Sequence, residues 1–261
     1  MANNVHGEFT WYELVTSDLA AAEDFYGKVV GWNFADSGMT DRDYHFFTAG
    51  DAGIGGMMAL TDEMKSGGAS PFWMGYVEVD DVDAGAEAIG KAGGTVHMQP
   101  WDIPNVGRMS LVTDPSGAMF YIMKGAQPSD SPAYSKYEPK VGHCAWNELM
   151  CDDPEATKSF YSEQLGWAAG ESMDMGPMGT YHMMQHGDYS IAGMMQKPAE
   201  APMAMWNYYF RVADIDKAVE TVKAEGGQVM MGPMEIPGGD FSVNAVDPQG
   251  APFALVGARN G

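Results

Sequence analysis

The chain has 261 residues, of which 45% are hydrophobic and 19% charged, and its 36 acidic and 14 basic residues give a formal net charge of −22 at pH 7. This length and composition predict a folded protein with room for two hydrophobic cores, and they exclude a disordered chain. Because so large a negative charge repels phosphate groups, nucleic acids and anionic membrane surfaces are excluded as partners.

The predicted elements follow one order that repeats along the chain. A strand around residues 11–16 is followed by Asp18, an alanine-rich amphipathic helix, a glycine and a further strand. The same order returns around Asp81, Asp153 and Asp214, and an aspartate at such a position is typical of a helix N-cap. Short β-rich runs lie between the helices, separated by turn sequences such as DPSG and DPQG. We therefore expect an α+β protein of four modules, each consisting of a strand, a helix and three strands.

The four modules arise from the duplication of a two-module unit. When the chain is shifted by 135 residues, ten of the 26 positions in residues 7–32 are identical. We expect one domain over residues 1–125 and a second over residues 142–261, joined by a proline-containing linker of residues 126–141. Either each copy closes its own sheet or the two copies exchange modules, and the protein is a monomer or a homodimer.

The sequence carries no targeting signal that would place the protein outside the cytoplasm. No apolar stretch approaches the roughly 20 residues of a membrane-spanning helix, and the N-terminal segment lacks the order of a signal peptide. Cys144 and Cys151 fall on one predicted strand, where their spacing of about 23 Å is too long for a disulfide bond. We therefore expect a cytoplasmic protein with free cysteines.

Several motifs resemble those of one known superfamily. Both copies contain the pattern W-x-E-L, Asp, Ala, FY and GW, and the chain also contains VDDVDA and DPSG. These motifs are similar to those of the vicinal oxygen chelate superfamily. This superfamily includes glyoxalase I, extradiol dioxygenases and bleomycin- and fosfomycin-resistance proteins. The resemblance covers nearly the whole chain and implies tandem domains, each with two βαβββ modules that form a curved, barrel-like mixed sheet with helices outside. It is nearest to two-copy bacterial glyoxalase-like proteins, often labelled as hydroxylases.

The resemblance also implies three metal-ligand positions in each copy, on the strands before the N-cap aspartates and after the DP-x-G turn. In this chain the positions hold Trp11, Met74 and Tyr121 in the first copy, and Trp146, Asn207 and Ala254 in the second. Divalent cations prefer carboxylate or imidazole groups, which none of these residues supplies. The sequence therefore predicts that the usual metal site is missing and that no cofactor is bound.

Alternation along each strand indicates which residues share the concave face with these positions. We expect that face to carry Trp11, Glu13, Met74, Tyr76, Glu78 and Tyr121 in the first copy, and Trp146, Glu148, Asn207, Tyr209 and Arg211 in the second. Aromatic walls with a single carboxylate suit a small, largely apolar or aromatic organic molecule. We expect these residues to bind such a ligand.

Glu13 and Glu148 are the candidate catalytic residues. On the concave faces, Glu13 and Glu78 would form a carboxylate pair, whereas Glu148 and Arg211 would form an ion pair. Two carboxylates in an apolar pocket raise the pKa of one of them and create a general acid or base. The alternative is that Glu13 and Glu148 accept hydrogen bonds from tyrosines or the backbone and fix the strand register.

The sequence leaves a choice between a binding protein, like the drug-resistance relatives, and an enzyme of the lyase, hydroxylase or dioxygenase type. The enzyme would use Glu13 or Glu148 on a carbon acid or an epoxide, or a divalent metal held by Glu13, His45 and Glu78. His45 and the matching His182 each follow a tyrosine on equivalent strands. Each histidine is therefore a base, a replacement ligand or a structural residue.

Overall fold

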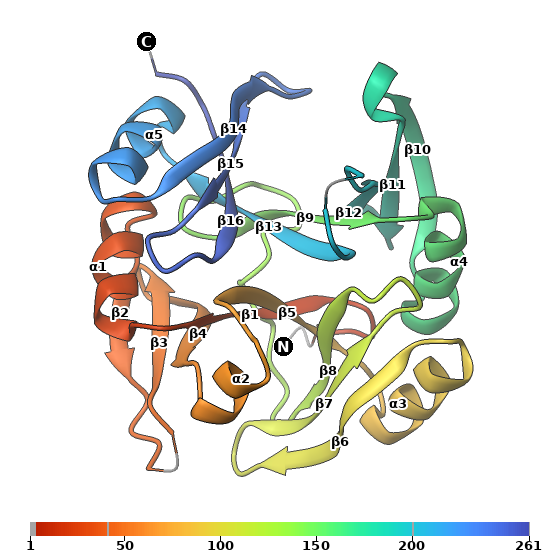
Figure 1. The fold of residues 1–261 in the computed structure, drawn as a ribbon. Coiled ribbons are helices and arrows are strands. Elements are labelled where there is room, and N and C mark those ends of the chain that lie inside the picture. Colours follow the sequence, from red (N-terminus) through yellow and green to blue (C-terminus); the bar gives the residue numbers. More distant parts are fainter. Residues whose placement is uncertain (1–3, 41, 200, 261) are drawn as a thin grey trace. The chain divides into compact units, whose positions relative to one another are not determined.

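The computed structural model describes residues 4–40, 42–199 and 201–260 (Figure 1). The predicted order of strand, helix and three strands occurs four times. In the first copy the elements are β1 (Phe9–Thr16), α1 (Leu19–Val29), β2 (Asn33–Asp36), β3 (Tyr44–Ala49) and β4 (Ala52–Ala59), then β5 (Phe72–Glu78), α3 (Val82–Lys91), β6 (Thr95–Ile103), β7 (Gly107–Thr113) and β8 (Met119–Gly125). A short helix that the sequence did not predict, α2 (Asp62–Ser66), lies between the two modules.

The second copy repeats this order. Its elements are β9 (Cys144–Cys151), α4 (Pro154–Leu165), β10 (Ala168–Asp174), β11 (Thr180–His186) and β12 (Tyr189–Gln196), then β13 (Met205–Val212), α5 (Ile215–Ala224), β14 (Gln228–Glu235), β15 (Phe241–Val246) and β16 (Pro252–Gly257). A 3-10 turn, η1 (Gly176–Met178), follows β10.

The strands form two mixed eight-stranded sheets, with the orders β2-β3-β4-β1-β5-β8-β7-β6 and β10-β11-β12-β9-β13-β16-β15-β14. In each module the first strand pairs in parallel with the last, and the remaining pairs within a module are antiparallel. The sheets are curved and do not close on themselves. The α+β class with tandem βαβββ modules is therefore confirmed.

The four predicted N-caps are confirmed as well. Asp18, Asp81, Asp153 and Asp214 each accept a hydrogen bond from a backbone N–H in the first turn of the helix that follows. A carboxylate at this position satisfies a donor that has no partner within the helix and interacts favourably with the helix dipole. The modules therefore share one way of starting their helices.

Contacts between residues divide the chain into two compact units that do not coincide with the two copies. Unit 1 consists of Met1–Thr10, Met74–Ser131 and Trp146–Trp206, and unit 2 of Trp11–Trp73, Pro132–Ala145 and Asn207–Gly261. Unit 1 thus contains the second and third modules, and unit 2 the first and fourth. The predicted domains, residues 1–125 and 142–261, correspond to the two copies of the sequence repeat, and their boundaries stay a prediction.

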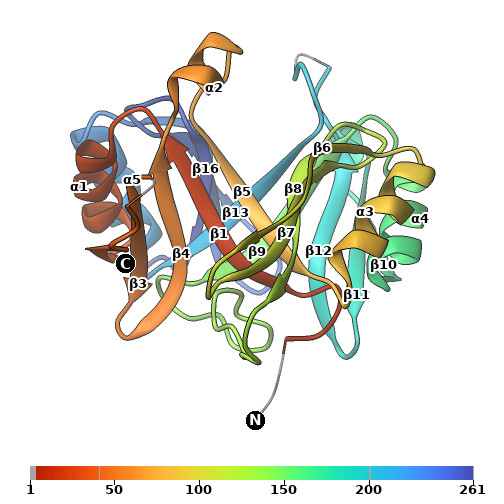
Figure 2. The ribbon, with the colours of Figure 1, turned by 90° about the horizontal axis from the view of Figure 1, so that it is seen from below.

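In unit 1, helices α3 and α4 lie side by side (Figures 1 and 2). Tyr161 on α4 donates its phenol O–H to Asp114 Oδ2 at 3.0 Å, and Asp114 belongs to the DPSG turn. Trp206 donates its indole N–H to the Tyr161 oxygen at 3.1 Å, and Trp167 stacks on the tyrosine ring with centroids 5.0 Å apart. Burial raises the pKa of Asp114, although Ser116, Ala118 and Tyr161 donate to the carboxylate.

Unit 2 repeats this arrangement with the matching residues of the other modules. Helices α1 and α5 lie side by side, and Tyr26 on α1 donates to Asp247 Oδ2 of the DPQG turn at 3.0 Å (Figure 2). Trp73 donates to the Tyr26 oxygen at 3.1 Å, and Trp32 stacks on its ring. Burial raises the pKa of Asp247 also. In both units, therefore, the FY motif of one copy is bonded to the DP-x-G turn of the other.

The predicted linker contains packed residues. Ala133 and Tyr134 are buried, and Tyr134 forms a β-bridge with Cys144. Cys144 and Cys151 are both buried and form no disulfide bond, as expected from their spacing, and burial raises the pKa of the Cys151 thiol to about 11. Among the described helices, none has both the length and the apolar character needed to cross a bilayer.

Candidate functional site

The structure divides the predicted site residues between the two compact units, and each set is described within its own unit. Unit 1 holds Met74, Tyr76, Glu78, Tyr121, Trp146 and Glu148, and unit 2 holds Trp11, Glu13, Asn207, Tyr209, Arg211 and Ala254. Trp11, Trp146 and Arg211 are partly exposed, and the others are buried.

In unit 1, a tyrosine connects the predicted tryptophan and glutamate of the second copy. Trp146 donates its indole N–H to the Tyr181 oxygen at 2.6 Å, and Tyr181 donates its O–H to Glu148 Oε2 at 2.9 Å. Gly193 lies opposite Glu148 in the pairing of β12 with β9. A Cβ atom on Gly193 would lie 2.0 Å from the Tyr181 oxygen, so only glycine leaves room for this ring.

Unit 2 contains the same residue types from the first copy. Trp11 donates its indole N–H to the Tyr44 oxygen at 3.0 Å, and Glu13, on the same strand as Trp11, is 4% exposed. A Cβ atom on Gly56 would lie 2.2 Å from the Tyr44 oxygen. Phe46 meets the Trp11 ring edge-on, with centroids 6.1 Å apart. In both copies, therefore, a tryptophan donates a hydrogen bond to a tyrosine whose ring lies against a glycine.

The fifth strand carries an aromatic wall in unit 1. The parallel pairing of β5 with β8 places Tyr76 opposite Tyr121, and their rings stack with centroids 4.4 Å apart and an interplanar angle of 25°. Trp101 meets Tyr121 edge-on at 6.0 Å, and Met74 is buried on the same strand as Tyr76. Stacked and edge-on rings of this kind offer a rigid apolar surface to a planar ligand.

Glu78, at the end of β5, has a cationic partner in unit 1. The Glu78 side chain is 5% exposed, and its Oε1 atom lies 3.0 Å from Lys124 Nζ. Burial raises the pKa of the Glu78 carboxyl, while the Lys124 ammonium and the Gly125 amide act in the opposite direction. Glu13, its predicted carboxylate partner, belongs to unit 2. The structure therefore gives Glu78 an ion pair with Lys124.

In unit 2, the predicted residues of the second copy have polar partners that the sequence did not indicate. Arg211 forms a two-point ion pair with Asp240, with distances of 2.5 and 3.3 Å, and Asn207 donates to Asn244 Oδ1 at 2.6 Å. Within unit 2, Arg211 therefore has Asp240 as its ion-pair partner, whereas the sequence had led us to expect Glu148, which belongs to unit 1.

His45 and His182 lie toward the helices. His45 Nδ1 is hydrogen-bonded to Glu23 on α1, whereas its strand neighbours Tyr44 and Phe46 contact Trp11 on the opposite face. His45 is therefore not on the Trp11 face, and a metal set of Glu13, His45 and Glu78 is not supported.

His182 Nδ1 lies 3.2 Å from Lys158 Nζ on α4 and 3.1 Å from Ser172 Oγ. Both histidines thus have structural partners beside a helix. The hydrogen bond that His45 donates to the Glu23 carboxylate raises the pKa of His45, whereas burial, reinforced by the Lys158 charge, lowers that of His182.

The residues at the expected metal positions do not fit a divalent cation. Trp11 and Trp146 present indole N–H groups that already donate to tyrosines, and the Asn207 amide donates to Asn244. Met74, Tyr121 and Ala254 supply a thioether, a phenol and a methyl group, none of which a hard cation prefers. Among the residues that the structure describes, no group of three His, Cys, Asp or Glu side chains is arranged to hold a metal ion.

The polar partners that were missed from the sequence include Tyr44, Tyr181, Lys124, Asp240 and Asn244. For the tyrosines a signal was present, since each precedes a matched histidine and each copy has a glycine at the matching position of a neighbouring strand. For the other three no local pattern exists, because their contacts depend on strand register and on side-chain direction.

Comparison with known proteins agrees with the duplicated pattern. A model described as the glyoxalase/bleomycin resistance protein/dioxygenase superfamily matches residues 8–122 and 140–255. The chain is 33% identical to the protein CFP32 of Mycobacterium bovis, a glyoxylase by provisional assignment, over 96% of this chain and 94% of that one. It is 29% identical to the anthracycline biosynthesis protein DnrV of Streptomyces peucetius, over 98% and 94% of the two chains.

A solved structure shares the fold at much lower identity. The Mn(II)-bound glyoxalase from Novosphingobium aromaticivorans superposes with a TM-score of 0.66 at 15% identity, covering all of this chain and 84% of its own. At this identity the similarity supports the architecture alone.

Proposed function

Because the chain belongs to the glyoxalase/bleomycin resistance protein/dioxygenase superfamily, we propose that it binds a small, largely apolar or aromatic organic molecule beside Trp11 and Trp146, without the divalent metal of its metal-dependent relatives. The observation that carries the proposal is the hydrogen bonding of both tryptophans, which stand where the family resemblance places metal ligands. An indole N–H that donates to a tyrosine has no lone pair to offer a cation.

The chemistry of the surrounding side chains supports an aromatic ligand. Tyr76, Tyr121 and Trp101 form a packed wall in unit 1, and Phe46 extends the surface beside Trp11 in unit 2. Such surfaces bind flat apolar molecules by stacking and by removing apolar area from water. The relative DnrV carries the name of anthracycline biosynthesis, which is consistent with an organic ligand.

The metal-free part of the proposal is tested by elemental analysis of the purified full chain. We expect a substoichiometric content of manganese, iron, nickel and zinc, and unchanged binding of an aromatic ligand after treatment with a chelator. A stoichiometric ion, whose removal abolishes binding, would contradict the proposal.

The ligand part is tested by screening planar aromatic compounds against the intrinsic tryptophan fluorescence. Trp146→Ala and Trp11→Ala should each weaken the affinity of any compound bound beside the changed residue by roughly tenfold, because a stacked aromatic contributes about 1–3 kcal/mol. Met230→Ala serves as the control, since Met230 is 65% exposed on β14. Equal affinities of the tryptophan variants and the control would exclude these positions as the binding site.

The bond between Tyr181 and Glu148 favours a second candidate function, acid–base catalysis on a carbon acid or an epoxide. A buried carboxylate that is held in place by a phenol is a suitable general base. In that case Glu148→Gln, or Glu13→Gln for the other copy, would abolish turnover of an identified ligand while leaving its affinity nearly unchanged. Retention of turnover in both variants would exclude this function for both glutamates.

A further inference from the structure

Unit 1 contains a small polar cavity at the end of β5. It has a volume of about 240 Å³, and its lining includes Asn4, Glu78, Lys124, Gln127 and Ser129. None of Met74, Tyr76 and Tyr121 lines it, so it is separate from the aromatic wall. A volume of this size exceeds that of a single water, about 30 Å³, several times over, and therefore suits a small organic molecule.

Glu78, which lines this cavity, has one buried carboxylate oxygen without a hydrogen-bond partner among the described residues. Its Oε1 atom pairs with Lys124, but among the residues that the structure describes, its buried Oε2 atom has no hydrogen-bond partner. Because a buried carboxylate oxygen without a donor is costly, native proteins rarely contain one unless a water, an ion or a ligand supplies the missing bond. Glu78 lines the cavity and the Gly125 amide also stabilises its carboxylate, so a donor in the cavity that reaches the buried Oε2 atom would supply the one bond still missing.

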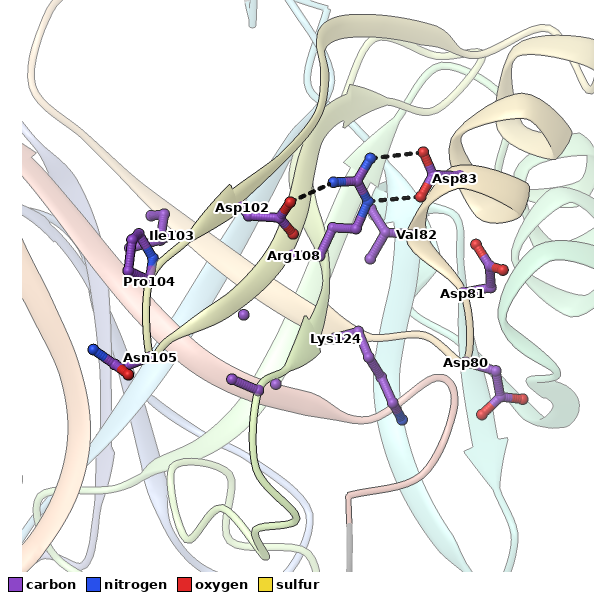
Figure 3. A pocket seen from close by; sticks show the side chains of 13 residues that line it. Asp80, Asp81, Val82, Asp83, Asp102, Ile103, Pro104, Asn105, Arg108 and Lys124 are labelled. Carbon is purple, nitrogen blue, oxygen red and sulfur yellow. Dashed lines mark hydrogen bonds and ion pairs between the residues drawn. The ribbon is translucent and has the colours of Figure 1, made fainter.

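The charges around the cavity indicate what kind of donor is missing. An open cleft of about 530 Å³ adjoins the cavity, and Lys124 and Gly125 line both (Figure 3). Figure 3 shows Arg108 in this cleft bonded to Asp83 on one side and to Asp102 on the other.

Two further carboxylates of the cleft, Asp80 and Asp81, have no basic residue of the cleft as a partner. Glu78 and the four aspartates outnumber Arg108 and Lys124 by three charges. This excess of negative charge attracts cations.

We propose that the cavity binds a small organic ammonium ion, whose N–H group donates to Glu78 Oε2, and that the ion enters through the cleft beside Lys124. An ammonium group satisfies the carboxylate oxygen by a charge-assisted hydrogen bond, which is stronger than one from a neutral group. Lys124 is 44% exposed at its side chain and can move aside to admit a ligand. A metal ion is a poorer candidate, because no described group of three His, Cys, Asp or Glu side chains is arranged to hold one.

The test is an NMR titration of the ¹⁵N-labelled full chain with n-butylammonium, followed at the amide signals of Gly125, Gln127 and Ser129. We expect saturable shifts, whereas 1-butanol, a neutral molecule of the same shape, should give none. Glu78→Gln should weaken the n-butylammonium affinity roughly tenfold or more, since a hydrogen bond to a charged group contributes about 1.5–3 kcal/mol. Glu63→Gln, which removes the same charge from α2 in unit 2, should leave the affinity unchanged.

Two further variants keep the test decisive if Glu78→Gln fails to fold. Asp80→Asn changes an exposed side chain and should weaken the affinity about twofold, because it lowers the charge of the cleft. Lys124→Met removes the ion that competes for Glu78 and should tighten the affinity. Equal shifts with 1-butanol, unchanged affinity in these variants or the absence of saturable shifts would overturn the proposal and leave water as the partner of Oε2.

The titration also separates this inference from the proposed function. Binding of a planar aromatic compound beside Trp146 or Trp11 is followed by tryptophan fluorescence and should be insensitive to Asp80→Asn and Lys124→Met. Loss of aromatic binding alone would contradict the proposed function, whereas loss of ammonium binding alone would contradict the polar cavity.

Discussion

Tyr181 and Tyr44 lie close against glycines because no side chain stands between them and the neighbouring strand. The Tyr181 ring approaches Gly193, and its oxygen lies between the Trp146 indole and the Glu148 carboxylate. Such an arrangement places three polar groups without an unpaired donor among them. The position of the tyrosine ring therefore depends on the absence of a side chain at the glycine as well as on the hydrogen bonds of the tyrosine oxygen.

Substitution of that glycine should disturb the tyrosine measurably. In Gly193→Ala the new Cβ atom would lie 2.0 Å from the Tyr181 oxygen, so the ring has to move. We expect the free energy of unfolding to fall by about 1–3 kcal/mol, the usual cost of overpacking. Gly90→Ala is the control, because its Cβ atom meets nothing nearer than 4.0 Å, and a helical alanine stabilises by about 0.5–1 kcal/mol. Equal urea denaturation midpoints for both variants would contradict this account.

The matched histidines should titrate on opposite sides of the ordinary pKa of about 6.5. NMR titration of the imidazole Hε1 protons should place the pKa of His45 above this value and that of His182 below it. Glu23→Gln should lower the pKa of His45 by replacing its charged acceptor with a neutral one, and Lys158→Met should raise that of His182 by removing a neighbouring positive charge. A common pKa for both residues would contradict the assigned environments.

The same pKa shifts affect stability with opposite signs. A raised pKa in the folded state means that His45 stabilises below the ordinary pKa, and this stabilisation is lost as the pH rises through the folded pKa. A lowered pKa means that the His182 contribution becomes unfavourable as the pH falls from the ordinary pKa toward the folded one. Wild type and the two variants should therefore differ in the pH dependence of their unfolding free energy over this range.

At the scale of elements, each module uses the same helix start and the same parallel closing pair. Helix α4 adds Pro154 after its N-cap Asp153, whose carboxylate accepts from the Ala156 backbone N–H at 3.1 Å. A proline here costs no hydrogen bond, because the first helical N–H has no partner within the helix. The sequence signals for these helices are local, which explains why all four positions were predicted correctly.

Removal of this cap should destabilise the protein by a predictable amount. We expect Asp153→Ala to lower the free energy of unfolding by about 1 kcal/mol, since it leaves an N–H of α4 unsatisfied. Asp153→Asn should recover most of that loss, because an amide oxygen also accepts the bond. Urea denaturation distinguishes the two variants, and an Asn variant as unstable as the Ala variant would show that the charge, not the hydrogen bond, provides the effect.

At the scale of the whole molecule, the repeat in the sequence and the compact units divide the chain differently. Each unit takes one module from each copy, and its buried tyrosine is bonded to an aspartate of the other copy. A single copy therefore contains half of each unit. The aromatic groups around Tyr26 and Tyr161 require both halves to be present.

We expect neither half of the chain to fold alone into its native structure. Fragments of residues 1–131 and 132–261 should each lack the near-ultraviolet circular dichroism of packed aromatic rings, because Tyr161 loses Asp114 and Tyr26 loses Asp247. Mixing the fragments should restore the signal and a single folded complex of one copy of each. A monomeric fragment with native dichroism and cooperative unfolding would show that the copies are independent.

The sequence by itself determined the superfamily, the α+β class, the four modules and the helix starts. These properties depend on local patterns, namely the period of hydrophobic residues, the N-cap aspartates and the DP-x-G turns, which the duplication shows twice. The comparisons and the structure confirm them. The roles of Glu13 and Glu148, and the absence of a metal, remain proposals.

The tertiary structure alone decided the partners of the charged and polar groups. Arg211 pairs with Asp240 and Glu78 with Lys124, and the two histidines lie toward the helices rather than on the tryptophan faces. It also decided which modules form compact units, a choice that the sequence had left open. Alternation along a strand indicates which face a side chain occupies, but the residue it meets there depends on the register of neighbouring strands and on packing between segments far apart in the chain.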